Sequence, residues 1–428
     1  MANILLKNGE VFGADGNIRQ ADIAIVDTLI DKVGSVPSDW QADRVIDCTN
    51  KLITPGFVNT HTHAAMTLFR SYADDMALMD WLQNKIWPAE ERLTAEDVYW
   101  GTQLAIAEMI KSGTTTFADM YSFMDQVAMA VEQSGIRAVL CRGMIGIGPN
   151  AELALAESKT LFTEWHNKAE GRITVMLGPH APYTCPPDYL KTVCQLAEKL
   201  EAEIHIHLSE TAGEVTDCVK QYGKSPIALM NEVGLLDHGV LAAHCVHVSP
   251  EDIIIMKEKG VRVAHNPGSN MKLASGVAPV PAMLEAGLVV GLGTDGASSN
   301  NNLDMLEEMR LAALLHKVNT LDPLALPAKE ALKMATSAGA ATVGLDKVTG
   351  TLVPGFQADI TIVSMEAPHW YPRHNCASLL TYAANAADVE TVLVAGKVLL
   401  DNRRLTTIDE EKVYHEAQRR GGKLCENE

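Results

Sequence analysis

The sequence lacks the features of a membrane protein and of an exported protein. No stretch of its 428 residues approaches the roughly 18 uncharged apolar residues of a membrane span. Lys7, Glu10 and Asp15 interrupt the N-terminal pattern, so no basic segment precedes an apolar run as in a signal peptide. The 8 cysteines form no CxxC pair, which predicts reduced thiols and not a disulfide framework. We therefore expect a cytoplasmic protein.

Positive charge is also scarce. The chain has 35 lysines and arginines against 54 aspartates and glutamates, a formal net charge of -19. Nucleic acids and anionic membranes are polyanions and would be repelled by such a surface. We expect neither as a partner.

Several common catalytic motifs do not occur. The sequence contains no HExxH, no GxSxG and no GxxxxGK[ST], which disfavours a helical zinc protease site, a serine nucleophile elbow and a phosphate-binding loop. The HxE and PCxxC patterns of the zinc deaminases that act on flipped bases are absent too. Any metal or nucleophile must therefore be held in another arrangement.

The two ends of the chain share one sequence pattern. Residues 1–57 and 350–428 alternate apolar and polar positions between frequent turns, as in ADIAIVDTLIDKVG and GTLVPGFQADITIVS. This pattern is typical of short antiparallel strands. We predict that both segments join in one small β-sandwich domain, with a helix from about Glu410 on the outside.

The region between them, residues 58–349, has a different pattern. Apolar runs of strand length alternate with longer stretches of helical spacing, which indicates βα units and a parallel sheet. Eight such runs occur, the number that closes a barrel. They are PGFVNTHTH, TTTFADM, RAVLCRGMI, ITVMLGPHAP, EIHIHLSE, VLAAHCVHV, VRVAHNPGSN and LVVGLGTDG. The predicted fold class is α/β, a TIM-like (β/α)8 barrel with the small β-sandwich domain attached.

Each of the eight runs ends in residues that are costly to bury without a purpose. In a parallel barrel all carboxyl ends open on one face, where the active sites of this architecture lie. We therefore expect these side chains to converge. In chain order they are His61 and His63, Asp119, Arg142, His180, His207 and Glu210, His244, His265 and Asn266, and Asp295.

His61 and His63 are one residue apart on a predicted strand, so their side chains point to the same side. Neutral imidazole is a good ligand for zinc or iron, and a catalytic site needs about three protein ligands and a position for water. An HxH pair alone is more often packing than ligation. His207 and Asp295, expected on the same face, complete a predicted site for a divalent metal, with Zn²⁺ favoured over Fe²⁺ or Mn²⁺.

The fourth strand indicates how many metal ions the site holds, and the fifth strand indicates which histidine is a ligand. Two-metal barrels commonly bridge their ions with a carboxylated lysine at the end of the fourth strand, but here that strand ends at His180 without a lysine. We therefore predict one metal. His205, two residues before His207, is the competing ligand. Because it lies one layer deeper, we predict that it braces the site from the core.

Longer motifs surround five of these strand ends: PGFVNTHTH, HLSET, AHCVH, HNPGSNMKL and GTDGASSNN, while ADITIV closes the terminal sheet. Along nearly its whole length the chain resembles the amidohydrolase superfamily, and most of all its branch of S-adenosylhomocysteine and 5'-methylthioadenosine deaminases. The resemblance implies a hydrolase that converts the adenine ring of 5'-methylthioadenosine, S-adenosylhomocysteine or adenosine to the hypoxanthine product and releases ammonia.

The resemblance also implies a set of nucleoside-binding residues. The stretch DWLQNKIWPAEER offers Trp81 as an aromatic contact and Glu90 as acceptor of hydrogen bonds from the ribose hydroxyls. His180 would meet a ring nitrogen, and Arg142 would face the amino-acid tail. Alternatively, Glu90 is a carboxylate of a first helical turn, since Pro88 suits that position as well.

A second cation for a charged substrate tail is missing. A homocysteine carboxylate is best held by more than one cation, but no lysine or arginine occurs from Met144 to Ser158. The preferred nucleoside therefore stays open. We expect a homo-oligomer, in which a neighbouring subunit could supply the charge.

The same residues indicate a mechanism. A divalent metal lowers the pKa of a water molecule, so that hydroxide near neutral pH can attack the ring carbon bearing the amino group. Asp295 is placed to accept the proton of this water, and Glu210 to protonate the adjacent ring nitrogen. His244 would stabilise the charge on the attacking oxygen, or be a histidine behind the site with no chemical role. Asp119 is predicted to be structural.

Two other functions are consistent with parts of the pattern. A hydrolase of the same superfamily that acts on a guanine-like, triazine or chlorinated ring would keep the metal ligands and Glu210, but would not need Glu90 or His180. A barrel that has lost catalysis is disfavoured because no predicted ligand is missing.

Overall fold

The strands at the two ends of the chain form one sheet in the computed structural model, which describes residues 3–425. The strand order is β18-β17-β16-β15-β5-β1-β2-β3, and β4 pairs with β1. The two halves join where β5 runs antiparallel to β15, with Ile53 opposite Ile362. The strands are β1 (Ile4–Phe12), β2 (Ile18–Val26), β3 (Leu29–Gly34), β4 (Arg44–Asp47), β5 (Lys51–Pro55), β15 (Ile360–Ser364), β16 (Val389–Val394), β17 (Lys397–Asp401) and β18 (Arg404–Leu405).

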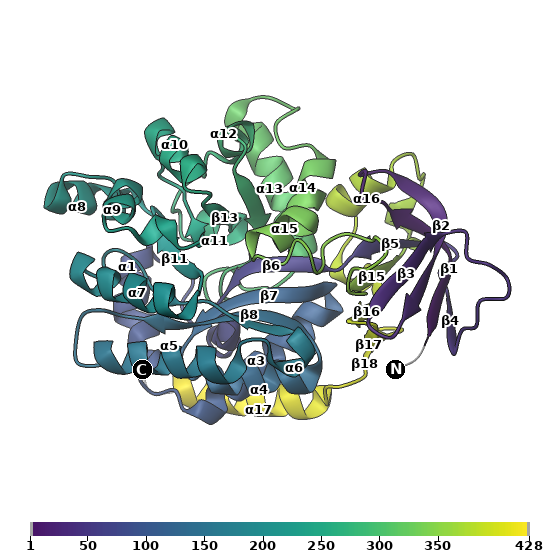
Figure 1. Ribbon diagram of the computed structural model, residues 1–428, viewed down its shortest axis with the longest axis horizontal. Coiled ribbons are helices and arrows are strands. Elements are labelled where there is room, and N and C mark those ends of the chain that lie inside the picture. Colours follow the sequence, from purple (N-terminus) through teal and green to yellow (C-terminus); the bar gives the residue numbers. More distant parts are fainter. Residues whose placement is uncertain (1–2, 426–428) are drawn as a thin grey trace.

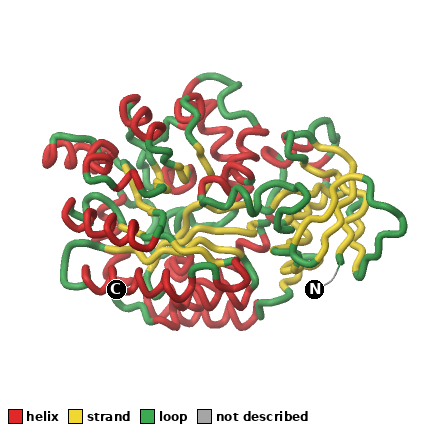
Figure 2. The backbone as a smooth tube through the Cα atoms, viewed as in Figure 1, coloured by secondary structure: helices red, strands yellow, loops and turns green. Residues whose placement is uncertain are grey.

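The predicted short strands at both ends are therefore confirmed. Apolar residues from both halves, among them Leu6, Ile23, Ile53 and Ile362, share one buried core. Figures 1 and 2 show these strands beside the helix-rich remainder of the chain. Their arrangement as a two-layer sandwich stays a prediction.

All eight predicted runs of the central region form parallel strands, the fourth in two short pieces. They are β6 (Phe57–Thr62), β7 (Thr114–Tyr121), β8 (Arg137–Met144), β9 (Ile173–Val175), β10 (Gly178–Pro179), β11 (Ile204–Leu208), β12 (Val240–His244), β13 (Arg262–His265) and β14 (Val289–Leu292). Strands β6 to β10 form one hydrogen-bonded group and β11 to β14 another.

Backbone hydrogen bonds connect these two groups at both edges. The His205 N–H donates to the Leu177 carbonyl at 2.8 Å, and the Asp295 N–H donates to the His61 carbonyl at 2.9 Å. The strand ends that carry polar side chains are thereby brought to one face, as expected for a TIM-like α/β fold.

Helices alternate with the central strands, most of them on the outside, and others fall between the strands of the terminal sheet along the chain (Figure 1). They are α1 (Leu78–Trp81), α2 (Trp87–Glu90), α3 (Ala95–Lys111), α4 (Met124–Ser134), α5 (Ala151–Trp165), α6 (Lys168–Gly171), α7 (Pro187–Leu200), α8 (Ala212–Tyr222), α9 (Pro226–Glu232), α10 (Pro250–Glu258), α11 (Pro267–Lys272), α12 (Val280–Glu285), α13 (Met305–Thr320), α14 (Ala328–Ala335), α15 (Ser337–Thr342), α16 (Cys376–Tyr382) and α17 (Glu410–Cys425); shorter helical turns are η1 (Ala64–Phe69), η2 (Leu82–Ile86), η3 (Leu235–Asp237), η4 (Pro368–Trp370) and η5 (Ala386–Asp388).

The expected C-terminal helix is α17, and it packs on α3 (Figure 1). Lys111 of α3 forms an ion pair with Glu410 at 2.6 Å, and Arg420 forms one with Asp97 at 2.7 Å. The end of the chain thus returns from the terminal sheet to the outside of the central unit. Within residues 3–425, no helix has both the length and the apolar character needed to cross a bilayer.

Candidate functional site

A pocket opens at the carboxyl ends of the central strands. All predicted site residues except His61 line it, and His61 is fully buried directly beneath. The lining members of the predicted set are His63, Trp81, Glu90, Arg142, His180, His207, Glu210, His244 and Asp295.

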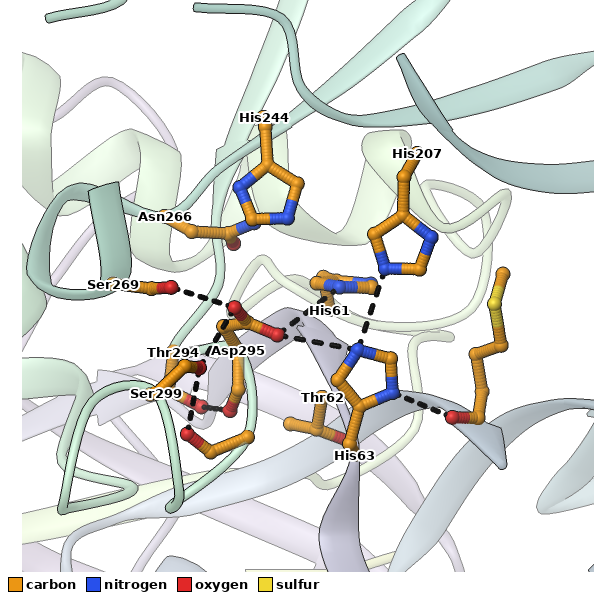
Figure 3. Close-up of polar contacts among 12 residues, drawn as sticks. His61, Thr62, His63, His207, His244, Asn266, Ser269, Thr294, Asp295 and Ser299 are labelled. Carbon is orange, nitrogen blue, oxygen red and sulfur yellow. Dashed lines mark hydrogen bonds and ion pairs between the residues drawn. The ribbon is translucent and has the colours of Figure 1, made fainter. Parts of the chain in front are cut away.

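Three imidazoles and one carboxylate meet at the base of the pocket (Figure 3). Oδ1 of Asp295 lies 3.4 Å from His61 Nε2 and 3.3 Å from His63 Nε2. The Nε2 atoms of His63 and His207 are 3.3 Å apart. Four tetrahedral ligands at zinc distances would lie about 3.3 Å from one another. These three separations fit ligands of one ion, and the ligand atoms of His61, His63 and Asp295 all lie within 4.8 Å of one another.

The other ring nitrogen of each of these histidines is already engaged. Nδ1 of His63 donates to the Met120 carbonyl at 2.6 Å, and Nδ1 of His207 donates to the His180 carbonyl at 2.7 Å. Nδ1 of His61 lies 2.9 Å from Nε2 of His205. Because a carbonyl can only accept, the first two contacts fix in His63 and His207 the tautomer that leaves a lone pair on Nε2, as a metal ligand requires. His205 thus contacts a predicted ligand from the core side.

Asp295 is held so that one oxygen stays available. The hydroxyls of Ser269 and Ser299 donate to Oδ2 at 2.6 and 2.8 Å (Figure 3). The residue itself has a φ of 60°, a left-handed conformation that is costly for a non-glycine residue and is concentrated at functional sites. The backbone therefore turns the carboxylate, with Oδ1 unshared, toward the imidazoles.

Two buried atoms at this point have no hydrogen-bond partner among the described residues. They are Nε2 of His61 and Oδ1 of Asp295, and leaving such atoms unsatisfied is costly. A divalent cation would satisfy both, so the donor set fits a metal. His61, His207 and His244 form an alternative group, with ligand atoms within 4.8 Å of one another.

Glu210 and His244 face each other across the pocket, with Oε2 of the glutamate 3.8 Å from Nε2 of the histidine. Burial raises the pKa of Glu210, which favours its protonated form. Two further side chains orient the pair. Glu214 accepts hydrogen bonds from the backbone N–H groups of Ser209 and Glu210, both at 2.8 Å, and Asn270 accepts one from Nδ1 of His244 at 2.9 Å.

Glu90 lies on the opposite wall, where helix α2 ends. Its Oε1 accepts a hydrogen bond from the Tyr121 hydroxyl at 2.7 Å. Burial raises the pKa of Glu90. The indole of Trp81 is buried nearby in the pocket wall, and its Nε1 has no partner among the described residues. A carboxylate that faces the pocket does not fit the alternative of a surface helix residue.

His180 and Arg142 occupy adjacent parts of the wall. Nδ1 of His180 shares a hydrogen bond with Thr184 Oγ1 at 2.9 Å, which leaves Nε2 for a ligand. Nε of Arg142 donates to Glu157 at 2.7 Å. The guanidinium is thus already paired with a carboxylate of α5.

Not every polar strand end converges on the pocket. Asp119 accepts hydrogen bonds from the Thr62 hydroxyl and the Ala64 N–H behind the site, at 2.9 and 2.7 Å, as its predicted structural role requires. His265 points away, and its Nε2 lies 3.2 Å from that of His316 on α13. The expectation of convergence is wrong for these two side chains, whereas Asn266, next to His265, has its Nδ2 3.4 Å from Nδ1 of the pocket residue His244.

The residues that hold the predicted site in place were not found from the sequence. Ser269, Asn270 and Ser299 lie inside HNPGSN and GTDGASSNN, so the density of polar residues in these motifs was the only available signal. Tyr121 gave no sequence signal, because an aromatic residue at a strand end usually packs in the core.

Proteins of known family resemble this chain over nearly its full length. The pattern of the amidohydrolase family matches residues 52–399. Relatives named 5-methylthioadenosine/S-adenosylhomocysteine deaminase include one from Pelotomaculum thermopropionicum, 56% identical over 100% of both chains, and one from Desulforudis audaxviator, 54% identical over 99% of both.

Solved structures also resemble this chain over nearly its full length. An adenosine deaminase from Xanthomonas campestris with bound zinc superposes with a TM-score of 0.95, at 35% identity, over 99% of this chain and 98% of that one. An atrazine chlorohydrolase from Arthrobacter aurescens, complexed with zinc, has a TM-score of 0.91 at 25% identity, over 98% of this chain and 100% of that one.

Proposed function

Because this chain belongs to the amidohydrolase family, we propose that it removes the amino group from the adenine ring of 5'-methylthioadenosine, S-adenosylhomocysteine or adenosine by hydrolysis. The products are the hypoxanthine nucleoside and ammonia. Relatives at 50% to 56% identity bear the name of this deaminase. The observation that carries the function is a buried glutamate, Glu210, in one pocket with four converging ligand atoms.

The protein is a metal-dependent hydrolase, and we assign its single ion to His61, His63, His207 and Asp295. No lysine lines the described pocket, which supports one ion over a lysine-bridged pair. Three histidines and one carboxylate suit zinc best, although iron or manganese can use the same ligands. When bound, such an ion supplies a water of lowered pKa and polarises the reacting centre.

The protein side chains then move the protons. Asp295 accepts the proton of the attacking water. Glu210, whose raised pKa favours the protonated form, donates to the ring nitrogen beside the reacting carbon. His244, oriented by Asn270, hydrogen-bonds the attacking oxygen. The leaving amino group takes the proton held by Asp295 and departs as ammonia, while the added hydroxyl returns a proton to Glu210 and becomes the carbonyl of the product.

Binding of the nucleoside is assigned to the remaining wall. Glu90 accepts hydrogen bonds from the ribose hydroxyls with the oxygen that Tyr121 does not use. His180 presents Nε2 to a ring nitrogen, Trp81 supplies an apolar face, and Arg142 lies toward the 5' substituent. Pocket contact by all four supports this assignment.

We also propose a division into two domains. Residues 58–349 form a closed (β/α)8 barrel, supported by the backbone hydrogen bonds at both edges of the two strand groups. Residues 1–57 and 350–428 form the β-sandwich domain, supported by the common sheet and its separate apolar core, and its C-terminal helix α17 extends over α3 of the barrel. Self-association and a lack of nucleic-acid and membrane partners stay predictions, which light scattering and sedimentation with DNA or vesicles would test.

The function is tested by offering the purified protein adenosine, methylthioadenosine, adenosylhomocysteine, guanine and cytosine, and measuring ammonia. We expect release from the adenine nucleosides and not from guanine or cytosine. Glu210→Gln should lower kcat by about 100-fold or more while metal content is kept. Release from guanine, or from a triazine, with none from the nucleosides would contradict the substrate assignment.

A further inference from the structure

The pocket offers little positive charge to a substrate tail. Of the described residues that line it, Arg142 is the only lysine or arginine. The proposed substrates differ at this end, because a methylthio group is uncharged whereas a homocysteine group carries a carboxylate and an ammonium group. Selection between them therefore depends on how free the Arg142 guanidinium is.

Arg142 lies between two cavities and is bound on the side away from the ligands. Besides lining the main pocket, it lines a second cavity between α4 and α5. There its Nε donates to Oε2 of Glu157 at 2.7 Å, while another guanidinium N–H donates to the Gly143 carbonyl. Glu157 lines only the second cavity. The carboxylate thus holds the guanidinium without itself reaching the substrate pocket.

The second cavity adds negative potential close to Arg142. Its wall contains the acidic residues Asp125, Glu157 and Glu164, and Arg142 is its only lysine or arginine among the described residues. A substrate carboxylate that approaches Arg142 must either displace Glu157 from the guanidinium or share the guanidinium with it. The negative charges of the three acidic residues also repel this carboxylate. An uncharged 5' substituent neither competes with Glu157 for Arg142 nor is repelled by these carboxylates.

We propose that Glu157 is a specificity-determining residue that biases the enzyme toward nucleosides with an uncharged 5' substituent. This rests on the proposed function, since it deepens the substrate choice of the same site. The side chain of Glu157 is 45% exposed and that of Arg142 is 19% exposed. The pair is therefore partly screened by solvent, and its effect on selectivity is roughly twofold to fivefold.

The test compares Glu157→Gln with the parent protein on adenosylhomocysteine and methylthioadenosine. We expect kcat/KM for adenosylhomocysteine to rise roughly twofold to fivefold relative to that for methylthioadenosine. Glu164→Gln is the matched control, because Glu164 is exposed on the same helix and lines the same cavity without contacting Arg142. It should change the ratio less than Glu157→Gln does, because it removes a more distant charge of the same cluster and leaves the contact with Arg142 in place. The double variant Arg142→Gln/Glu157→Gln should lose the gain.

An unchanged ratio in Glu157→Gln would overturn the proposal. So would a fall for adenosylhomocysteine, because it would mean that Glu157 binds the substrate ammonium group. Calorimetric titration of both nucleosides in a Glu210→Gln background gives the same comparison with little turnover, and tighter binding of adenosylhomocysteine is expected when Glu157→Gln is added. A parent protein that binds the nucleosides but releases no ammonia would contradict the proposed function alone.

Discussion

At the scale of single residues, the pocket combines neutral imidazoles with one that favours its charged form. Burial lowers the pKa of His61 to about 4 and that of His180 to about 3, so both rings are neutral near pH 7. For His244 burial also lowers the pKa, but Glu210 and Asp295 outweigh it and raise the pKa overall. A neutral ring suits His61 as a metal ligand and His180 as a contact to the ring of the substrate. The ring of His244, with its raised pKa, suits stabilisation of developing negative charge.

Glu90→Ala tests the ribose assignment at this scale. Removing a charged acceptor of hydrogen bonds should lower kcat/KM for adenosine by about ten- to a hundredfold, because such bonds contribute about 1.5–3 kcal/mol each. Free adenine has no ribose, so its slow deamination should be unaffected. Ammonia release from both compounds is the measurement.

Tyr121→Phe is the matched control for this experiment. It removes the hydroxyl that donates to Glu90 but keeps the carboxylate, so its loss on adenosine should be smaller than that of Glu90→Ala. Equal losses on adenosine and adenine in Glu90→Ala would rule out a ribose-binding role.

The sequence could predict which residues lie close together, but not which of their atoms are free to bind a metal. His61 and His63 follow from strand periodicity, and His207 and Asp295 from strand ends. The choice of Nε2 as the free nitrogen depends on backbone carbonyls of Met120 and His180, which belong to neighbouring strands. Such contacts between distant segments have no signal within one strand's sequence.

At the scale of elements, helix α13 holds two active-site loops together. The buried carboxyl of Glu308 accepts hydrogen bonds from the Gly268 N–H at 2.9 Å and from the Asn300 side chain at 2.7 Å. Gly268 and Asn300 are the chain neighbours of Ser269 and Ser299, whose hydroxyls donate to Asp295. One glutamate thus supports both serines that orient the predicted ligand.

Glu308 should also make stability depend on pH. Burial raises its pKa from 4.5 to about 8, so the folded state keeps this proton at pH values where the unfolded state has lost it. The stability this group provides is complete below pH 4.5 and declines as pH rises to about 8. Relative to Glu308→Gln, the parent protein should lose a few kcal/mol of unfolding free energy across this range, at about 1.4 kcal/mol per pKa unit.

Urea unfolding of the parent and Glu308→Gln at several pH values measures this difference, in which the titration of other groups cancels. Glu307→Gln is the control, because Glu307 is the exposed neighbour on the same helix. A difference between parent and Glu308→Gln that does not change with pH would contradict the account. The sequence did not predict this role, since acidic residues in a first helical turn are usually solvated.

At the scale of the whole molecule, the fold brings the two ends of the chain together twice. The strands of the N-terminal and C-terminal segments join where β5 pairs with β15, and α17 returns to α3. The sequence predicted the shared sheet because both ends have the same alternating pattern. It could not predict where α17 packs, since one apolar helix face fits many partners and the choice depends on ion pairs such as Arg420 with Asp97.

The central claim is that one ion at the convergence of His61, His63, His207 and Asp295 supports deamination of an adenine nucleoside. The most direct measurement is ammonia release from methylthioadenosine by protein stripped of metal with a chelator and then titrated with Zn²⁺. We predict that activity disappears on stripping and returns in full at about one equivalent. Ammonia release that persists in fully stripped protein, or that needs two equivalents, would contradict it.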